Sequence, residues 1–378
     1  MFFAAVALFG AAAFADMQVR SDYAGANVSV KKLGSSVAVV EPDSSSSKRP
    51  GYYWNFEAKG GAGAKVRVEG ETVVDAGGVF FSTDGGATWS QTGENSVRTD
   101  GGAAEFNLPK AGVFVRMSSV IPYQAGDFKK FARETGLKIL PFCTTESGAQ
   151  NFRVSCGEAN SKNRLIITCR HHACETAASF VLEGVLAAAK NSKKVGVDAF
   201  PFIDLDSVER GEQGKWRAPR DFNQDYFGEP RYNAVAELKK FAAAASSGRR
   251  TIVLDLHSPS IAPAMDSENR ANCIYFVFGR NSQKVLRAKK FSASLAELCQ
   301  KTHCRLCNFP QMDIAYNPVF HDRRPRTFAQ WCETLPCVEL SAAIEIPFAR
   351  KKGLPSASPD DLRDFGKALF MQIERGFE

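Results

Sequence analysis

The sequence predicts an α/β protein in two parts, an N-terminal antiparallel β-sandwich followed by an α/β/α domain with a mixed sheet. Three observations carry this prediction. Short alternating apolar runs fill residues 19–121, strands alternate with helical stretches beyond residue 122, and a chain of 378 residues exceeds one ordinary domain. We therefore expect a signal peptide at 1–15, a sandwich at 16–122 and a second domain at 123–378.

The first fifteen residues resemble a secretory signal. Residues 2–15 are uncharged and apolar, and they end in Ala13-Phe14-Ala15 before Asp16, a small-x-small pattern typical of a signal-peptidase site. The run is too short to span a bilayer. Because a basic n-region is missing, a buried helix is the alternative. The interpretation places the mature protein outside the cytoplasm, secreted or periplasmic, without stable membrane insertion.

Alternating strands separated by glycine- and serine-rich turns predict the sandwich. Runs of this kind are Val28–Val30, Ala64–Val68 and Val113–Val115, and none of the intervening stretches has a long helical period. A tight turn at Asp84-Gly85-Gly86 leads to Trp89, which indicates a hairpin with an aromatic anchor.

Strands and helices alternate in the second part, which favours a sheet between helical layers. The expected helices are Asp127–Thr135, Thr176–Lys190, Arg231–Ser246, Ser282–Cys299 and Asp360–Arg375. The expected strands are Leu137–Phe142, Leu165–Cys169, Val195–Ile203, Thr251–Leu256 and Val338–Ile346.

Composition is that of a globular protein. Hydrophobic residues make up 44% of the chain and charged residues 24%, and the net charge is only +7. The lysines and arginines are scattered, so we expect no nucleic-acid partner. A basic pocket for an acidic substrate stays possible, and the oligomeric state is left open.

Two strand ends carry candidate metal ligands. His172 and Glu175 form an H-x-x-E motif just after an apolar strand, and His257 stands at the end of another apolar strand, directly after Thr251–Leu256. A catalytic zinc takes three protein ligands and keeps one open position. These three residues supply that number, so we predict a site for one Zn²⁺ ion. Each histidine taken alone would more often be structural.

A glutamate in a late apolar strand is the candidate base. Glu345 lies between isoleucines, where an unpaired carboxylate is costly to bury. We expect it to accept a proton from water activated by the metal and to pass it to the leaving amine. Glu339, six residues earlier, is the competing candidate, and a salt bridge to an arginine is the structural alternative.

A long loop between the two motifs is rich in hydrogen-bonding side chains. It runs from Asp204 to Tyr226 and contains Arg217, which is expected to stabilise a tetrahedral oxyanion. A surface position for Arg217 is the alternative. Farther along the chain, the basic cluster His321–Arg326 either lines a pocket for an acidic side chain or forms a solvated loop.

The even number of ten cysteines fits an oxidising compartment. Cys304 and Cys307 have C-x-x-C spacing beside Cys299 and His303, which permits a second zinc site. We prefer a disulfide there, with Cys332 or Cys337 as further candidate partners.

Taken in order, these motifs resemble the M14 zinc carboxypeptidases. Tyr53-Trp54-Asn-Phe56, the turn before Trp89 and Ile121-Pro122-Tyr123 look like the sandwich that precedes the catalytic domain in the cytosolic-carboxypeptidase-like branch, which also has bacterial members. The resemblance implies a zinc-carboxypeptidase fold for residues 123–378. It also implies a metallocarboxypeptidase that hydrolyses C-terminal peptide or amide bonds of a peptide or peptide-like substrate.

The resemblance also implies roles for individual residues. His172, Glu175 and His257 match the zinc ligands, Glu345 the general base and Arg217 the polarising arginine.

One substrate-binding position departs from the family. Asn223 matches the asparagine of the pair that grips the terminal carboxylate, whereas Gln224 replaces its arginine and cannot form the bidentate ionic contact. Trp216 stands where a small polar residue is expected, and the family's substrate-capping tyrosine is not assigned, since Tyr316 lies in a loop. A zinc amidase or endopeptidase that needs no free C-terminal carboxylate, and a non-catalytic binding protein, are therefore the alternatives.

Overall fold

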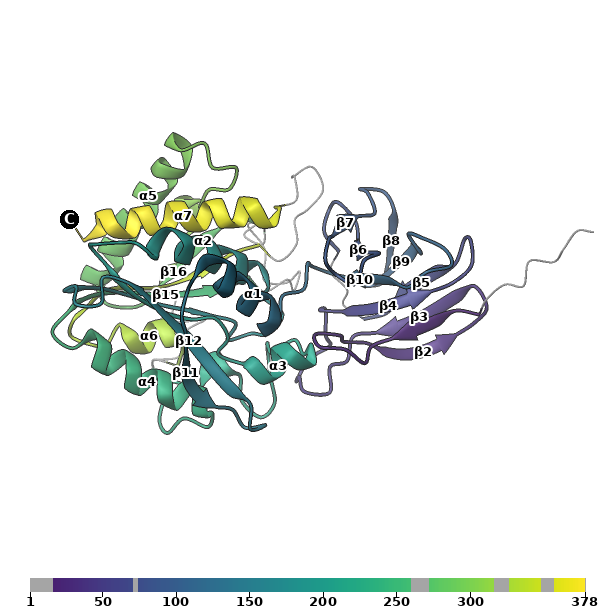
Figure 1. The fold of residues 1–378 in the computed structure, drawn as a ribbon, viewed down its shortest axis with the longest axis horizontal. Helices are drawn as coiled ribbons and strands as arrows, with labels where there is room; N and C mark the ends of the chain where they lie inside the picture. Colours follow the sequence, from purple (N-terminus) through teal and green to yellow (C-terminus); the bar gives the residue numbers. More distant parts are fainter. Residues whose placement is uncertain (1–15, 71–73, 260–271, 316–325, 348–356, 378) are drawn as a thin grey trace, which may run out of the picture.

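The computed structural model describes residues 16–70, 74–259, 272–315, 326–347 and 357–377. The predicted signal peptide, Tyr316 and most of the basic cluster, residues 321–325, lie outside these ranges. In the described part, two bodies follow each other along the chain: two small sheets first, then a large sheet between helices (Figure 1). The predicted fold class is confirmed.

The N-terminal body is a sandwich of two five-stranded sheets, ordered β1-β4-β10-β6-β7 and β2-β3-β5-β9-β8. Its strands are β1 (Gln18–Arg20), β2 (Ser29–Leu33), β3 (Val37–Glu41), β4 (Asn55–Lys59), β5 (Lys65–Val68), β6 (Phe80–Ser82), β7 (Ser90–Gln91), β8 (Val97–Asp100), β9 (Ala103–Asn107) and β10 (Val115–Ser118). All pairs are antiparallel except β3 and β5. Alternating residues fill the core between the sheets, where Trp54 stacks on Phe106.

The second body is built on a seven-stranded mixed sheet ordered β11-β12-β14-β13-β15-β17-β16. Its strands are β11 (Ile139–Thr144), β12 (Gln150–Gly157), β13 (Asn163–Cys169), β14 (Gly196–Phe200), β15 (Arg250–His257), β16 (Tyr275–Phe278) and β17 (Val338–Glu345). The four central strands β14, β13, β15 and β17 are parallel, β12 and β16 flank them in antiparallel pairs, and β11 pairs antiparallel with β12. The carboxyl ends of β13, β15 and β17 therefore meet at one edge.

Helices cover both faces of this sheet. They are α1 (Ala125–Thr135), α2 (Ala177–Ala189), α3 (Leu205–Arg210), α4 (Asn233–Ser246), α5 (Ser282–Lys301), α6 (Phe328–Cys332) and α7 (Pro359–Gly376). Figure 1 shows α2, α5 and α7 on one face and α4 and α6 on the other. Successive residues of β13 alternate between the two cores: Leu165 and Ile167 face α2 and α7, and Ile166 faces α4. Full burial of this parallel strand on both faces explains its unbroken apolar run.

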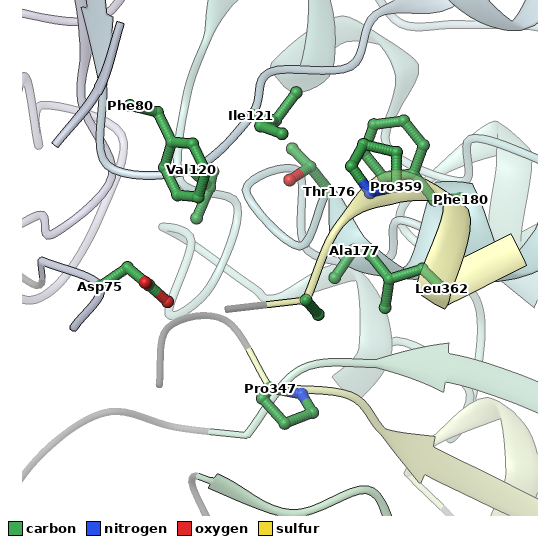
Figure 2. Close-up of a pocket in the computed structure, with 11 residues that line it drawn as sticks. Asp75, Phe80, Val120, Ile121, Thr176, Ala177, Phe180, Pro347, Pro359 and Leu362 are labelled. Atoms are coloured by element: carbon green, nitrogen blue, oxygen red, sulfur yellow. The ribbon is translucent and has the colours of Figure 1, made fainter. Parts of the chain in front are cut away.

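The two bodies touch along a short connection, since β10 ends at Ser118 and α1 begins at Ala125. A small, mostly apolar cavity lies at this junction, where Phe80 and Val120 face Phe180 and Leu362 (Figure 2). A second contact lies near the carboxyl edge of the large sheet. There the backbone N–H of Lys48 donates to the carbonyl of Trp216 and that of Ala218 donates to Ser46.

No helix among the described residues is both long and apolar enough to cross a membrane.

Candidate metal centre and active-site pocket

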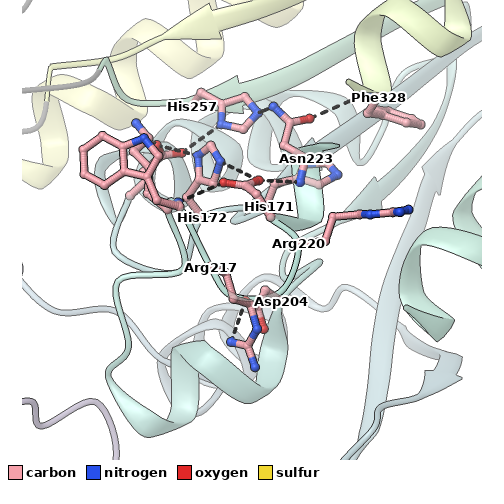
Figure 3. A network of polar contacts seen from close by, with 12 residues as sticks. His171, His172, Asp204, Arg217, Arg220, Asn223, His257 and Phe328 are labelled. Atoms are coloured by element: carbon pink, nitrogen blue, oxygen red, sulfur yellow. Dashed lines mark hydrogen bonds and ion pairs between the residues drawn. The ribbon is translucent and has the colours of Figure 1, made fainter. Parts of the chain in front are cut away.

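Glu175 joins two histidines, His172 and His257, that come from neighbouring strand ends and are labelled in Figure 3. Its Oε1 lies 2.9 Å from Nδ1 of His172, and its Oε2 lies 2.9 Å from Nδ1 of His257. His172 and Glu175 follow β13, and His257 is the last residue of β15. All three side chains are buried, so a carboxylate and two imidazoles converge in a site with little water.

The outer nitrogen of each imidazole meets a second carboxylate. Nε2 of His172 lies 3.1 Å from Oδ1 of Asp221, and Nε2 of His257 lies 2.9 Å from Oδ2 of Asp255. Such partners fix the orientation of a metal-binding imidazole and increase its basicity. In both rings it is therefore Nδ1 that faces the space beside Glu175.

This set of atoms suits a metal ion. The ligand atoms of His172, Glu175 and His257 all lie within 4.8 Å of one another, and two nitrogens with one carboxylate form an established set for catalytic zinc. His171, Asp255 and His257 form a second group of similar size. Its His171 ring, however, is held between Asp255 at 2.9 Å and the Tyr226 hydroxyl at 2.6 Å. Because the first group reaches a pocket through His172, we take it as the candidate metal centre.

Electrostatics at the metal centre follow from these contacts. Burial lowers the pKa of His172, but Asp221 and Glu175 outweigh this effect and raise it to about 9. Burial raises the pKa of Glu175, but Lys215, His172 and His257 together hold it well below its usual value. The carboxylate is therefore ionised, as a ligand must be.

A buried lysine also belongs to the site. The ammonium group of Lys215 lies 2.8 Å from Oε1 of Glu175 and donates to the carbonyl of Ser258, also at 2.8 Å. Burial lowers the pKa of Lys215, but Glu175 and Glu345 outweigh this effect and raise it. The sequence prediction missed this residue.

Glu345 stands next to the metal centre. It is the last residue of β17 and the direct partner of His257 in the parallel pair with β15. Its Oε2 is buried without a hydrogen-bond partner among the described residues. Burial raises the pKa of Glu345 and outweighs the nearby charges of His257 and Lys215, which lower it. An unsatisfied buried carboxylate oxygen of this kind indicates a functional group more than a structural one.

The competing glutamate lies at the far end of the same strand. Glu339 accepts from Nε of Arg250 at 2.9 Å and from Arg287 at 2.5 Å. The structural alternative, a salt bridge, therefore applies to Glu339.

The candidate metal centre opens, at His172, into a pocket of about 700 Å³ with a strongly basic wall. Its lining consists of Lys48, Arg49, His172, Lys215, Trp216, Arg217, Pro219, Arg220, Asp221, Gln224, Phe227 and Arg326. Lys48 and Arg49 come from the sandwich, so both bodies build the wall. Gln224 is exposed in this pocket, whereas Asn223 is buried with Nδ2 3.1 Å from Nε2 of His257.

Arg217 lies on the pocket wall, but its guanidinium is directed away from the metal centre. Its Nη1 donates to Glu212 at 2.6 Å and to Ser207, and lies 3.5 Å from Asp204 (Figure 3). Asp204 is buried, and its ionised form requires a cation. The structure therefore does not bring Arg217 to the position that the sequence prediction gave it.

The local backbone explains why Lys215 and not Arg217 turns inward. Gly214 has φ of +75°, and a Cβ at this position would lie 2.4 Å from the backbone nitrogen of Ala173. The loop thus packs directly against the peptide that follows His172. Trp216 also adopts a left-handed conformation, with φ of 56°, and its N–H donates to Asp221. The backbone constraints at Gly214 and Trp216, on either side of Lys215, therefore set the direction of the lysine side chain.

The predicted disulfide is absent, since all ten cysteines are free thiols. Cys299, Cys304 and Cys307 belong to the core under α5 and α7, whereas Cys332 belongs to the core under α4 and α6. The sheet separates them, so a bond to Cys332 is impossible. The two metal-binding groups found among the described residues contain no cysteine, and the second zinc site that the C-x-x-C spacing permits is not one of them.

Other residues that sequence reasoning missed are Asp221, Asp255 and Tyr226. Asp255 precedes His257 by two residues on a strand, so both side chains point to one face. The two-residue spacing of Asp255 and His257 could therefore have identified Asp255 as a neighbour of the site. Asp221 and Tyr226 lie in an irregular loop, where no period relates them to the histidines.

The fold of this chain is similar to that of solved carboxypeptidase structures. A metallo-carboxypeptidase from Burkholderia cenocepacia superposes with a TM-score of 0.75 at 14% identity, covering 96% of this chain and 99% of that chain. The chain has the fold of the metallo-carboxypeptidases. A metallo-carboxypeptidase from Pseudomonas aeruginosa, in complex with (2-guanidinoethylmercapto)succinic acid, gives 0.76 at 15% identity and covers 95% and 98%. Carboxypeptidase A from Helicoverpa armigera gives 0.50 at 10% identity and covers 67% and 73%.

Because the first two carboxypeptidase structures cover nearly the whole chain, the shared fold includes both the sandwich and the large sheet. No protein-family profile and no curated protein matches the chain by sequence.

Proposed function

We propose that this protein is a zinc-dependent peptidase that removes residues from the C-terminus of a peptide. The observation that carries the proposal is the convergence of His172, Glu175 and His257 beside the unpaired Oε2 of Glu345. A zinc ion bound there would supply a Lewis acid that polarises the scissile carbonyl and makes water more acidic. The carboxypeptidase fold of the neighbours supports the same reaction.

Different residues of this chain are proposed to transfer the proton, to orient the imidazoles and to bind the substrate. Glu345 accepts the proton of the attacking water and later gives it to the leaving amine nitrogen. Its raised pKa suits this exchange, because a base that is too weakly basic would not take the proton. Asp221 and Asp255 hold the two imidazoles in place throughout. The pocket above the centre, with its basic wall, receives the substrate's anionic end.

Asn223 and Gln224 are proposed to contact the substrate's terminal carboxylate, with weaker recognition than an arginine at 224 would give. A neutral amide forms one ordinary hydrogen bond, and losing a charge-assisted one costs about 1.5–3 kcal/mol. Arg220 and Arg326 line the same pocket and supply positive charge near Gln224. Side-chain preference is expected to favour anionic substrates for the same reason.

Matched peptides test the proposal. The purified, zinc-loaded protein is assayed on peptides with a free and an amidated C-terminus, and zinc is quantified in the same sample. Faster release from the free peptide, with one zinc per chain, supports a carboxypeptidase. Equal rates would favour the amidase or endopeptidase alternative, to which Gln224 points. Binding of peptide without turnover, in a protein that takes up no zinc, would favour the binding-protein alternative.

We also propose export and membership of the cytosolic-carboxypeptidase-like branch. The sandwich preceding the large sheet supports the branch, and the apolar residues 2–15 support export. Expression in a bacterial host followed by N-terminal sequencing checks export: a periplasmic product should begin at Asp16. A cytoplasmic product that keeps residues 1–15 would contradict it.

A further inference from the structure

The ammonium group of Lys215 lies beside the candidate metal centre, where a zinc site needs no further positive charge. Glu175 already faces the two imidazoles that share the candidate metal with it, and a divalent ion would neutralise its charge. Lys215 nevertheless lies 2.8 Å from the same carboxylate and is buried there. A positive charge at this distance opposes metal binding. A role limited to neutralising Glu175 therefore does not account for Lys215.

We propose that Lys215, and not Arg217, provides the positive charge that stabilises the oxygen of the scissile carbonyl. This inference rests on the proposed peptidase function and assigns it a catalytic residue. Lys215 lines the pocket together with His172, so its side chain borders the space that a substrate would enter. The guanidinium of Arg217, in contrast, is held by Glu212 and Ser207.

Hydrogen-bonding capacity supports the assignment. An ammonium group has three N–H donors. The structure gives two acceptors among the described residues, Oε1 of Glu175 and the carbonyl of Ser258, and these hold the group in a fixed position. The third N–H can donate to a substrate oxygen. A cation already oriented in a buried site needs little rearrangement when charge develops, which is the condition for strong electrostatic catalysis.

The reaction then balances as follows. Water adds to the carbonyl carbon, and its proton passes to Glu345. The carbonyl oxygen gains negative charge and accepts a hydrogen bond from Lys215. When the C–N bond breaks, the carbonyl re-forms and Glu345 returns the proton to the amine nitrogen.

Lys215→Met tests the proposal through two readouts that move in opposite directions. Methionine keeps most of the side-chain volume and removes the charge. In the metal-free protein, competition with a chromogenic chelator should show zinc binding tighter by about tenfold or more, because the opposing charge is gone. In the zinc-loaded protein, kcat on the free-C-terminus peptide should fall by about 100-fold or more. Lys215→Arg should restore part of kcat.

Lys284→Met is the matched control. Lys284 is a partly buried lysine whose ammonium donates to the carbonyls of Glu333 and Leu335, away from the metal centre. The same substitution there should leave zinc affinity and kcat unchanged. A Lys215→Met protein with weaker zinc binding and lower kcat together would indicate a structural role and overturn the proposal. If kcat is unchanged in Lys215→Met but is lost in Arg217→Met, Arg217 and not Lys215 stabilises the scissile carbonyl oxygen.

Failure of the proposed function is recognised separately. If the wild-type protein takes up zinc but cleaves no peptide, the peptidase function is wrong, and so is the assignment of Lys215 to it. If wild type cleaves peptides and Lys215→Met cleaves them equally fast, only the assignment of Lys215 is wrong.

Discussion

His257 and Glu345 are direct partners in the parallel pair of β15 and β17, each at the last position of its strand. This register places the candidate base beside a candidate metal ligand without any contribution from a loop. Because both strands are buried and hydrogen-bonded on both sides, the spacing between the two residues is set by the most rigid part of the molecule.

Glu345→Gln should abolish turnover while leaving zinc content unchanged. Glutamine keeps the shape of the side chain but cannot accept the proton of the attacking water. We expect kcat to fall by about 10²–10⁴-fold, the usual contribution of a general base. Single-turnover hydrolysis and zinc quantification on the same sample check this. Glu339→Gln is the control at the other end of β17 and should retain kcat. Loss of activity in Glu339→Gln alone would identify Glu339, and not Glu345, as the general base.

Asp221→Asn should weaken zinc binding. The carboxylate lies 3.1 Å from Nε2 of His172 and orients that ring toward Glu175. Loss of an outer carboxylate partner typically costs about 10–100-fold in metal affinity. Chelator competition gives the affinity, and far-UV circular dichroism confirms that the variant is folded. Zinc affinity equal to that of wild type would show that the ring is oriented without Asp221.

Gly214→Ala and Gly228→Ala form a matched pair. Both glycines have nearly the same left-handed φ, +75° and +76°, so both alanines carry a similar strain of about 1–2 kcal/mol. A Cβ at 228 meets nothing within 4 Å, whereas one at 214 meets the Ala173 nitrogen. The extra crowding should destabilise Gly214→Ala by about 1–3 kcal/mol more. Chemical denaturation measures the difference, and equal stabilities would contradict the close approach.

Asp313→Asn should flatten the pH dependence of stability. Burial raises the pKa of Asp313 to about 6, above its ordinary value of 3.8. The folded state therefore binds a proton that the unfolded state has released, and stability is lost as pH rises from about 4 through about 6. Oδ1 accepts the N–H of Phe276 at 2.8 Å, a bond that asparagine can keep. Tm measured between pH 4.5 and 7.5 should fall more in wild type than in Asp313→Asn; parallel curves would contradict this origin.

The sequence was most informative where regular strands carry the chemistry. His172, His257 and Glu345 each follow or end an apolar run, and parallel strands bring their carboxyl ends to one edge, so a shared site could be predicted from their positions. Strands β12 and β16 were missed, because their patterns are short or interrupted by polar residues.

Side-chain directions in the irregular loop between Asp204 and Tyr226 could not be predicted from strand or helix periodicity. Arg217 and Lys215 are two residues apart, and the left-handed backbone at Gly214 and Trp216, together with the buried carboxyl group of Asp204, decides which side chain enters the site. The cysteine prediction failed for a related reason. Spacing in the sequence does not show that a sheet lies between Cys332 and the thiols near Cys304.

Backbone pairing between residues 46–48 and 216–218 has a consequence for how the protein unfolds. The loop that carries Lys215 is completed by the sandwich, whose Tyr52 N–H also donates to the buried side chain of Gln213. Separating the two bodies would break these hydrogen bonds and expose the apolar cluster in which Tyr52 and Val120 pack with Cys174. We therefore expect a single cooperative transition on heating, with the sandwich and the large sheet melting together.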